Sequence, residues 1–188
     1  MKPNREYRSL ELLEQTDDYV IEGYATTFEP YELYEHDGIK YYEQIDRNAF
    51  DNADFSDVIM QYDHNGKVFA RTSNGTLQLS VDDKGLRVRA DLSKSQSAKE
   101  LYEEIKNGLI TKMSWAFSFE EQSYSSETRT RKFLKIKKVY DVSAVSIPAN
   151  QDTSINARSF FDGVIEEERR EFARAKAKRL RLLLEEGE

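Results

Sequence analysis

The sequence contains no cysteine and has two histidines, His36 and His64. Without cysteine the chain forms no disulfide, binds no metal through a thiolate and has no cysteine nucleophile. Zinc sites usually combine several His and Cys ligands, so the shortage of both argues against a zinc centre. We therefore expect a protein that uses neither a metal nor a cofactor.

Long apolar runs and excess positive charge are also missing. No stretch reaches the roughly 18 apolar residues of a membrane span, and Met1–Leu10 lacks the apolar core of a signal peptide. The net charge is -7, with 28 basic and 35 acidic residues, which opposes the basic surface that nucleic acids require. We expect a soluble, non-secreted protein that binds neither membranes nor nucleic acid.

The chain has 188 residues, of which 38% are hydrophobic and 12% aromatic, enough for one packed domain. From Val164 onward the composition changes to blocks of Glu, Arg, Lys, Ala and Leu, which is typical of a solvated helix. The sequence therefore predicts a domain over residues 1–160 and a charged helical tail over residues 161–188.

Alternating apolar and polar residues predict several strands. They are Tyr19–Phe28, Asp57–Tyr62, Leu77–Val81, Leu86–Leu92, Met113–Phe119 and a long run from Phe133 to Ile147. Leu77–Leu92 reads as one hairpin, and the last two strands as another. Asn65-Gly66 is a turn signal, and Pro148-Ala149-Asn150 ends the last strand.

Helices are few in this pattern. Ser97 and Glu100 form a capping box before an apolar stripe that ends at Asn107-Gly108, which predicts a short amphipathic helix. The segment Ile45–Phe50 could start another. Many strands with one core helix predict an α+β, β-dominated fold: a curled, mostly antiparallel sheet or barrel with flanking helices.

Two residues suggest nucleophilic catalysis, each beside a simpler interpretation. His64 follows a strand end and can act as a general base on a serine hydroxyl, or it can cap a turn. Ser114 lies on a strand face of small residues, which suits a nucleophile approached by substrate or simply close packing. Ser114 is not in a G-x-S-x-G motif, which excludes an α/β-hydrolase elbow.

Asp141 lies inside an apolar strand, where a carboxylate is unfavourable unless something binds it. A hydrogen bond to an imidazole N–H would satisfy the acid and orient a general base. Alternatively, Asp141 faces water at a sheet edge or pairs with Lys112 or Lys137.

Several segments, taken in order between Arg8 and Arg158, resemble the prohead maturation proteases of tailed bacteriophages. They are Arg8-Ser9-Leu10-Glu11, Ile21–Ala25, Glu43–Ile45, Ala49-Phe50, Asp63-His64 followed by Arg71, Lys84-Gly85-Leu86, Gly108-Leu109, Met113–Phe117, Asp141-Val142-Ser143 and Pro148-Ala149-Asn150. The chain departs from the family pattern at Trp115-Ala116 and Phe69-Ala70, where glycine is more usual.

The resemblance implies a serine endopeptidase of capsid maturation with the fold of the herpesvirus assembly proteases. It assigns the catalytic histidine to His64, the nucleophile to Ser114 and the third member to Asp141. Its expected substrates are the scaffolding protein or the scaffolding segment of the phage major capsid protein, and the enzyme itself, inside the prohead in the host cytoplasm.

The same resemblance suggests a homo-oligomer, because the herpesvirus relatives require dimerisation, and a tail that binds scaffold or is removed by self-cleavage. A different class of function stays open beside the protease. The chain would then be a non-catalytic capsid-assembly or scaffold-binding module that keeps the protease fold.

Overall fold

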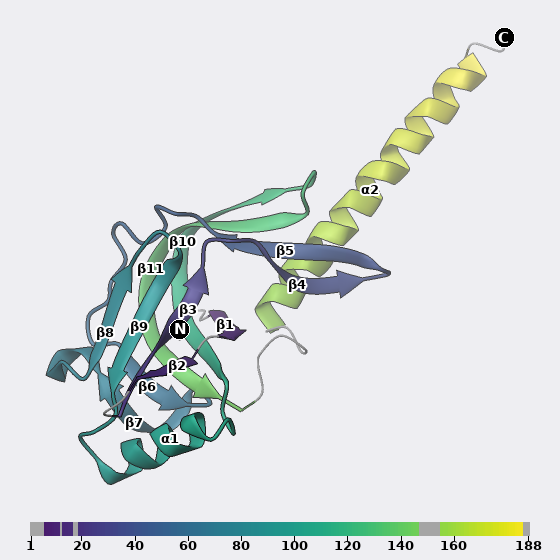
Figure 1. The fold of residues 1–188 in the computed structure, drawn as a ribbon. Coiled ribbons are helices and arrows are strands. Elements are labelled where there is room, and N and C mark those ends of the chain that lie inside the picture. Colours follow the sequence, from purple (N-terminus) through teal and green to yellow (C-terminus); the bar gives the residue numbers. More distant parts are fainter. Residues whose placement is uncertain (1–5, 12, 17–18, 147–154, 186–188) are drawn as a thin grey trace. The chain divides into compact units, whose positions relative to one another are not determined.

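The computed structural model describes residues 6–11, 13–16, 19–146 and 155–185 (Figure 1). The chain divides into two compact units, Met1–Asp152 and Thr153–Glu188. The first unit holds all the described strands, which form two sheets, and the short helix α1, Gln96–Lys106. The second holds one long helix, α2, Ile155–Glu185.

The larger sheet is mixed and has seven strands. Its main path runs β1 (Glu6–Glu11), β10 (Lys112–Ser125), β11 (Thr130–Val145), β5 (Ile39–Ile45) and β4 (Tyr31–His36). The hairpin of β6 (Ile59–Tyr62) and β7 (Asn65–Arg71) joins it through β6, which pairs with β11. β11 pairs in parallel with β5 near its start and with β6 near its end, so this one strand connects the whole sheet.

The smaller sheet is antiparallel and has four strands. Its order is β2 (Leu13–Thr16), β3 (Val20–Thr27), β9 (Gly85–Asp91) and β8 (Leu77–Val81), and a 3-10 turn, η1 (Thr72–Asn74), precedes β8. β3 and β9 approach closely at Gly85, where an added Cβ would lie 2.1 Å from the carbonyl oxygen of Thr26. Only glycine fits this position, because any side chain would overlap the backbone of the neighbouring strand.

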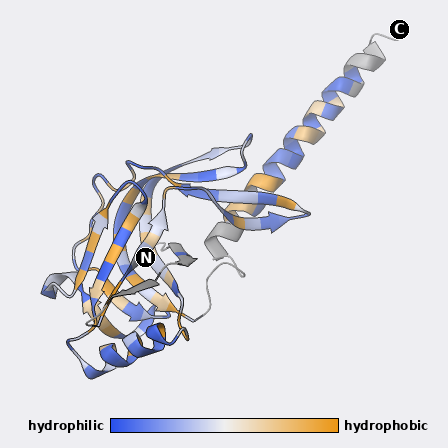
Figure 2. Cartoon of the chain, viewed as in Figure 1, coloured by the Kyte–Doolittle hydropathy of each residue, from blue (hydrophilic) through white to orange (hydrophobic). Residues whose placement is uncertain are grey.

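The core draws its residues from both sheets and from α1. Ile21 and Val88 belong to the same buried cluster as Trp115, Phe117 and Phe133. The Trp115 and Phe117 rings stack with centroids 4.1 Å apart, and Phe117 meets Phe133 edge to face at 5.1 Å. Figure 2 shows hydrophobic residues as orange bands along the strands. These aromatic contacts hold one side of β10 firmly in the core.

Most predicted elements are present, and of the two predicted arrangements, a sheet or a barrel, the barrel is wrong. Neither sheet closes, because β1 and β4 end the larger sheet without pairing to each other, and β2 and β8 end the smaller one. The α+β, β-dominated class is confirmed. The Pro148-Ala149-Asn150 signal lies outside the described residues.

Local predictions failed where two capping or turn signals competed. α1 is capped by Ser95, whose extended backbone lets its hydroxyl accept a hydrogen bond from the N–H of Ala98. The predicted cap, Ser97, is already helical. The segment after β5 forms reverse turns rather than a helix, with hydrogen bonds such as Ala49 N–H to the carbonyl of Asp46.

The helix α2 begins at Ile155, nine residues before the composition changes at Val164. Most of the residues of α2 that Figure 2 colours are hydrophilic, and pairs such as Arg170–Glu166, 3.1 Å apart, link successive turns. Among the described helices none is long and apolar enough to cross a membrane.

A buried ionic cluster ties the strands of the larger sheet together. Glu43 of β5 is fully buried and accepts hydrogen bonds from Arg8 of β1, 2.6 Å from Nη2 to Oε2, and from the hydroxyl of Tyr31 at 2.5 Å. Nη1 of Arg131, on β11, lies 3.6 Å from the same carboxylate. Burial, followed by the negative charge of Glu43, raises the pKa of Tyr31 well above its usual value.

We expect Glu43→Gln to lower the free energy of unfolding by about 3–5 kcal/mol, because it leaves two buried guanidinium groups without their counter-charge. Urea denaturation of the two proteins measures this difference. Glu120→Gln is the matched control, since Glu120 makes a 2.5 Å ion pair with Lys135 on the exposed surface and should change stability little. Equal losses in the two variants would contradict the expectation.

Candidate active site

The structure brings His64, Ser114 and Asp141 together from three separate parts of the chain. The imidazole of His64 bridges the other two side chains: Nδ1 lies 2.5 Å from Oδ1 of Asp141, and Nε2 lies 2.6 Å from Oγ of Ser114. With its proton on Nδ1, the imidazole donates to the carboxylate and accepts the hydroxyl proton of the serine. This is the hydrogen-bond chain of a nucleophile, a general base and an orienting acid.

The sheet register explains how two of the three residues meet. Ser114 of β10 lies opposite Ser143 of β11, and Asp141 lies opposite Ala116. Residues two apart on a strand share a face, so these four side chains lie on the same side of the sheet. Ala116 is fully buried opposite Asp141.

The third residue, His64, lies in the turn between β6 and β7. Tyr62 pairs with Asn65, so the connection is a two-residue loop of Asp63 and His64, with φ angles of 46° and 55°. Such hairpin turns favour glycine and asparagine, and each non-glycine residue in the left-handed region costs about 1–2 kcal/mol. The hairpin therefore holds His64 in a strained conformation, a common property of functional residues.

This turn differs from the one predicted at Asn65-Gly66. Those two residues begin β7 instead, although Gly66 still has a φ of 75°. An Asn-Gly pair is a strong local turn signal, but the pairing of β6 with β7 places the turn two residues earlier. The shift moves His64 from the edge of the loop to its second central position.

Contacts from the end of β11 fasten the strained turn. The N–H of Asp63 donates to the carbonyl of Ala144 at 3.0 Å. The carboxylate of Asp63 accepts hydrogen bonds from the N–H and the hydroxyl of Ser146, at 3.0 and 2.9 Å. Because Ala144 and Ser146 follow Asp141 closely on the chain, these bonds fix His64 relative to its acid.

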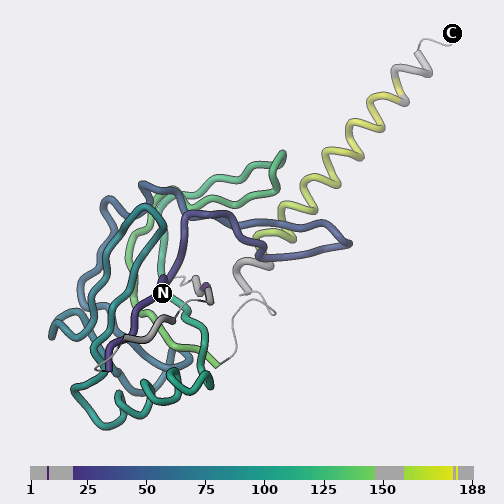
Figure 3. Tube along the Cα trace, viewed as in Figure 1, coloured from purple at the N-terminus to yellow at the C-terminus, as the bar shows by residue number. Residues whose placement is uncertain are grey.

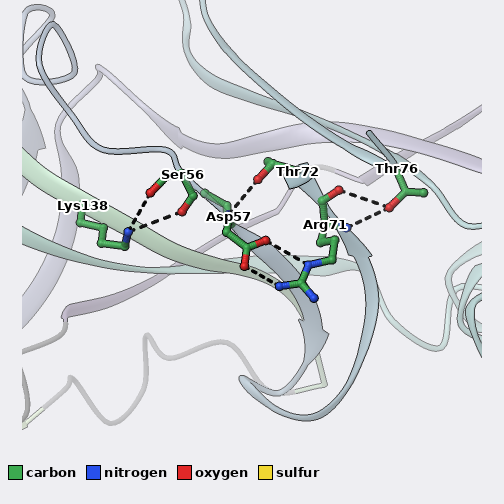
Figure 4. A network of polar contacts seen from close by, with 7 residues as sticks. Ser56, Asp57, Arg71, Thr72, Thr76 and Lys138 are labelled. Carbon is green, nitrogen blue, oxygen red and sulfur yellow. Dashed lines mark hydrogen bonds and ion pairs between the residues drawn. The ribbon is translucent and has the colours of Figure 1, made fainter. Parts of the chain in front are cut away.

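The opposite end of the β6–β7 hairpin is held by an ion pair (Figure 4). Arg71, at the end of β7, binds Asp57 through both carboxylate oxygens, at 3.0 and 2.5 Å. The side-chain hydrogen bond from Arg71 lowers the pKa of Asp57 below its usual value. The N–H of Val58 donates to Thr72 at 2.9 Å and closes the same loop.

Lys138 of β11 joins this network from the other side. Its ammonium donates to the carboxylate of Asp54 at 2.6 Å and to the hydroxyl of Ser56 at 3.2 Å, as Figure 4 shows for Ser56. The hydrogen bond from Lys138 lowers the pKa of Asp54. The hairpin that carries His64 is thus attached to β11 at both of its ends.

The three side chains are largely withdrawn from solvent. Ser114 is 1% exposed and Asp141 4%, while the side chain of His64 retains 18%. Hydrogen bonds are electrostatically stronger in such surroundings than in water. Burial therefore strengthens the hydrogen bonds that join the three side chains.

Sequence reasoning missed two residues that support the site. Ser143 donates its hydroxyl proton to Oδ1 of Asp141 at 2.9 Å, and Asp63 fixes the histidine turn. The alternation of β11 puts Ser143 on the face of Asp141, so its position could have been inferred. The contacts of Asp63 cross between distant segments and leave no local signal.

Among the described residues no cluster of three or more His, Asp and Glu side chains could hold a metal ion.

Comparisons with known proteins show what the whole chain resembles. The model of the caudovirus prohead serine protease family matches residues 5–164. The prohead protease of Enterobacteria phage HK97 is 29% identical over 146 residues. That alignment covers 77% of this chain but 62% of the relative, so the chain spans less than two thirds of that protein's length. The search of solved structures gave no significant match.

We expect the ion pair beneath the histidine hairpin to make stability depend on pH. The pKa of Asp57 is lowered in the folded protein, so the pair stabilises the fold above the ordinary aspartate value of about 3.9. That stabilisation disappears as the pH falls through the lowered value. The difference in free energy of unfolding between wild type and Arg71→Gln, measured by urea denaturation, should therefore become smaller from pH 6 to pH 2.

Lys67→Gln provides the control, because it removes a positive charge from the same strand without breaking an ion pair between described residues. Its stability gap to wild type should change little over this pH range. A gap for Arg71→Gln that stays constant down to pH 2 would contradict the role given to Asp57.

Proposed function

We propose that this chain, which belongs to the caudovirus prohead serine protease family, is a serine endopeptidase of phage capsid maturation. The observation that carries the proposal is the imidazole of His64, within 2.6 Å of the Ser114 hydroxyl and 2.5 Å of the Asp141 carboxylate. The family match supports the same reaction and the same biological role.

In the proposed reaction His64 acts as the general base. Its Nε2 takes the proton of Ser114 as Oγ attacks the carbonyl carbon of the scissile peptide bond. The imidazolium then gives that proton to the leaving amine, and an ester joins the acyl group to Ser114. Water, activated in turn by His64, hydrolyses the ester and releases the second product.

Asp141 has the orienting role in this mechanism. It accepts the Nδ1 proton of His64, which leaves the lone pair of Nε2 directed at Ser114. When His64 becomes positively charged, the adjacent carboxylate stabilises it. In chain order the proposed triad runs His64, Ser114, Asp141, unlike the three familiar hydrolase orders.

The proposed substrates follow from the family. They are the scaffolding protein or the scaffolding segment of the major capsid protein, and the protease itself, cleaved inside the assembling prohead. We propose further that residues 161–188 bind scaffold or are removed by self-cleavage. A fold shared with the herpesvirus assembly proteases, and a homo-oligomer like theirs, belong to the same proposal.

The alternative is a binding module that keeps the fold without catalysis. It would be favoured by a histidine and serine too far apart for a hydrogen bond, whereas an exposed and unpaired Asp141 would favour a β-rich adaptor domain unrelated to proteolysis. Neither condition holds, since Nε2 of His64 contacts Oγ of Ser114 and Asp141 is buried and hydrogen-bonded. These contacts favour the enzyme.

Ser114→Ala should abolish cleavage, because it removes the atom that forms the acyl-enzyme, while leaving the fold intact. Intact-mass measurements of the wild type and the variant, each expressed with and without the phage's own capsid and scaffolding proteins, test this. We expect fragments of scaffold or capsid protein, and any shortening of residues 161–188, in the wild-type preparations but not in those of Ser114→Ala. Uncut partners in both preparations would support the binding module.

Asp141→Asn should lower kcat by about 10⁴, because an amide donates where the carboxylate accepts and so favours the wrong imidazole tautomer. Cleavage rates of a scaffold-derived substrate measure the loss. Asp54→Asn is a suitable control, since Asp54 binds Lys138 at the far end of the hairpin without touching the three residues. Full activity of Asp141→Asn would reduce the proposed triad to a pair of Ser114 and His64.

A further inference from the structure

Ser143 is the one described side chain besides His64 that donates a hydrogen bond to the Asp141 carboxylate. Ser143 is fully buried, and its hydroxyl proton goes to Oδ1 at 2.9 Å. The same oxygen accepts the Nδ1 proton of His64 at 2.5 Å. One carboxylate oxygen therefore receives two donors that come from different elements.

The position of Ser143 follows from the β10–β11 ladder. It lies directly opposite Ser114, and on its other side it pairs with Gln61 of β6. Its backbone is thus fixed by two neighbouring strands. A donor anchored in this way holds an acceptor far more firmly than a flexible surface side chain would.

The aspartate needs such a restraint because its terminal torsion is soft. Rotation about χ2 of an aspartate is broad and roughly two-fold, so the imidazole alone would leave the carboxylate free to tilt. A second hydrogen bond to the same oxygen from the same strand fixes the plane of the group. Hydrogen bonds to a charged acceptor are also roughly twice as strong as neutral ones.

We infer that Ser143 is a positioning residue of the proposed protease, which holds Oδ1 of Asp141 in the orientation that His64 requires. The inference rests on the proposed function. Ser143 acts through Asp141, and none of its described hydrogen bonds reaches the atoms of His64 or Ser114 that take part in the reaction. Ser143 thus extends the hydrogen-bond chain of Ser114, His64 and Asp141 by one residue.

The test measures how fast a fluorophosphonate probe labels Ser114, in full-length protein assembled with its capsid and scaffolding proteins. The probe reacts with activated serine hydroxyls and needs no knowledge of the cleavage site. Ser143→Ala should slow labelling by about ten- to a hundredfold, the effect expected for losing a hydrogen bond to a charged group. Ser143→Thr keeps the hydroxyl and should restore most of the rate.

Ser118→Ala is the matched control. Ser118 is also a nearly buried serine, on β10, and its hydroxyl lies 3.3 Å from that of Tyr140, away from the three residues. It should label at close to the wild-type rate. An equal loss of rate in Ser118→Ala and Ser143→Ala would show a general packing effect and overturn the inference.

A double-mutant cycle separates positioning from stability. In an Asp141→Asn background Ser143 has lost its charged acceptor, so adding Ser143→Ala should change the labelling rate less than twofold. A full additional loss there would overturn the inference, as would wild-type labelling of Ser143→Ala in the presence of Asp141. Either of these two results would leave the proposed function intact, provided that the assembled wild type is labelled and Ser114→Ala is not. Absence of labelling in the assembled wild type would overturn both.

Discussion

The ladder between β10 and β11 is the constraint on which the remaining structure depends. It places Ser114 beside Ser143 and brings Asp141 onto the same face. On its other edge β11 accepts β5 and β6 in parallel. Because β6 leads directly into the turn that carries His64, one 16-residue strand sets the positions of all the groups in the candidate site.

The hairpin that carries His64 combines a strained turn with firm attachment. Two consecutive residues in the left-handed region would ordinarily relax to a turn built on Asn65-Gly66. The bonds of Asp63 to Ala144 and Ser146 prevent this at one end, and the Asp57–Arg71 pair holds the other. The strain at His64 is thus maintained by contacts that lie outside the hairpin loop itself.

The sequence predicted those features that local pattern determines. Alternation located the strands, including β3, β8, β9 and the start of β10, and the resemblance selected His64, Ser114 and Asp141, which the structure brings together. The assignment of their catalytic roles stays a prediction. The histidine turn was mispredicted because strand register between β6 and β7 outweighs local preference, and the helix cap was mispredicted because two local signals, Ser95 and Ser97, compete. The open sheets follow from pairings that composition does not encode.

The pairing of β1 with β10 limits how a peptide can reach the serine. At Ser114 one edge of β10 is bonded to β11 and the other to β1, with Ser9 in register, so no free strand edge remains there. A peptide that took the place of β1 would also pull Arg8 away from the buried Glu43. In the proposed reaction the scissile bond therefore reaches Ser114 at lower energetic cost from the sheet face, past the partly exposed ring of His64.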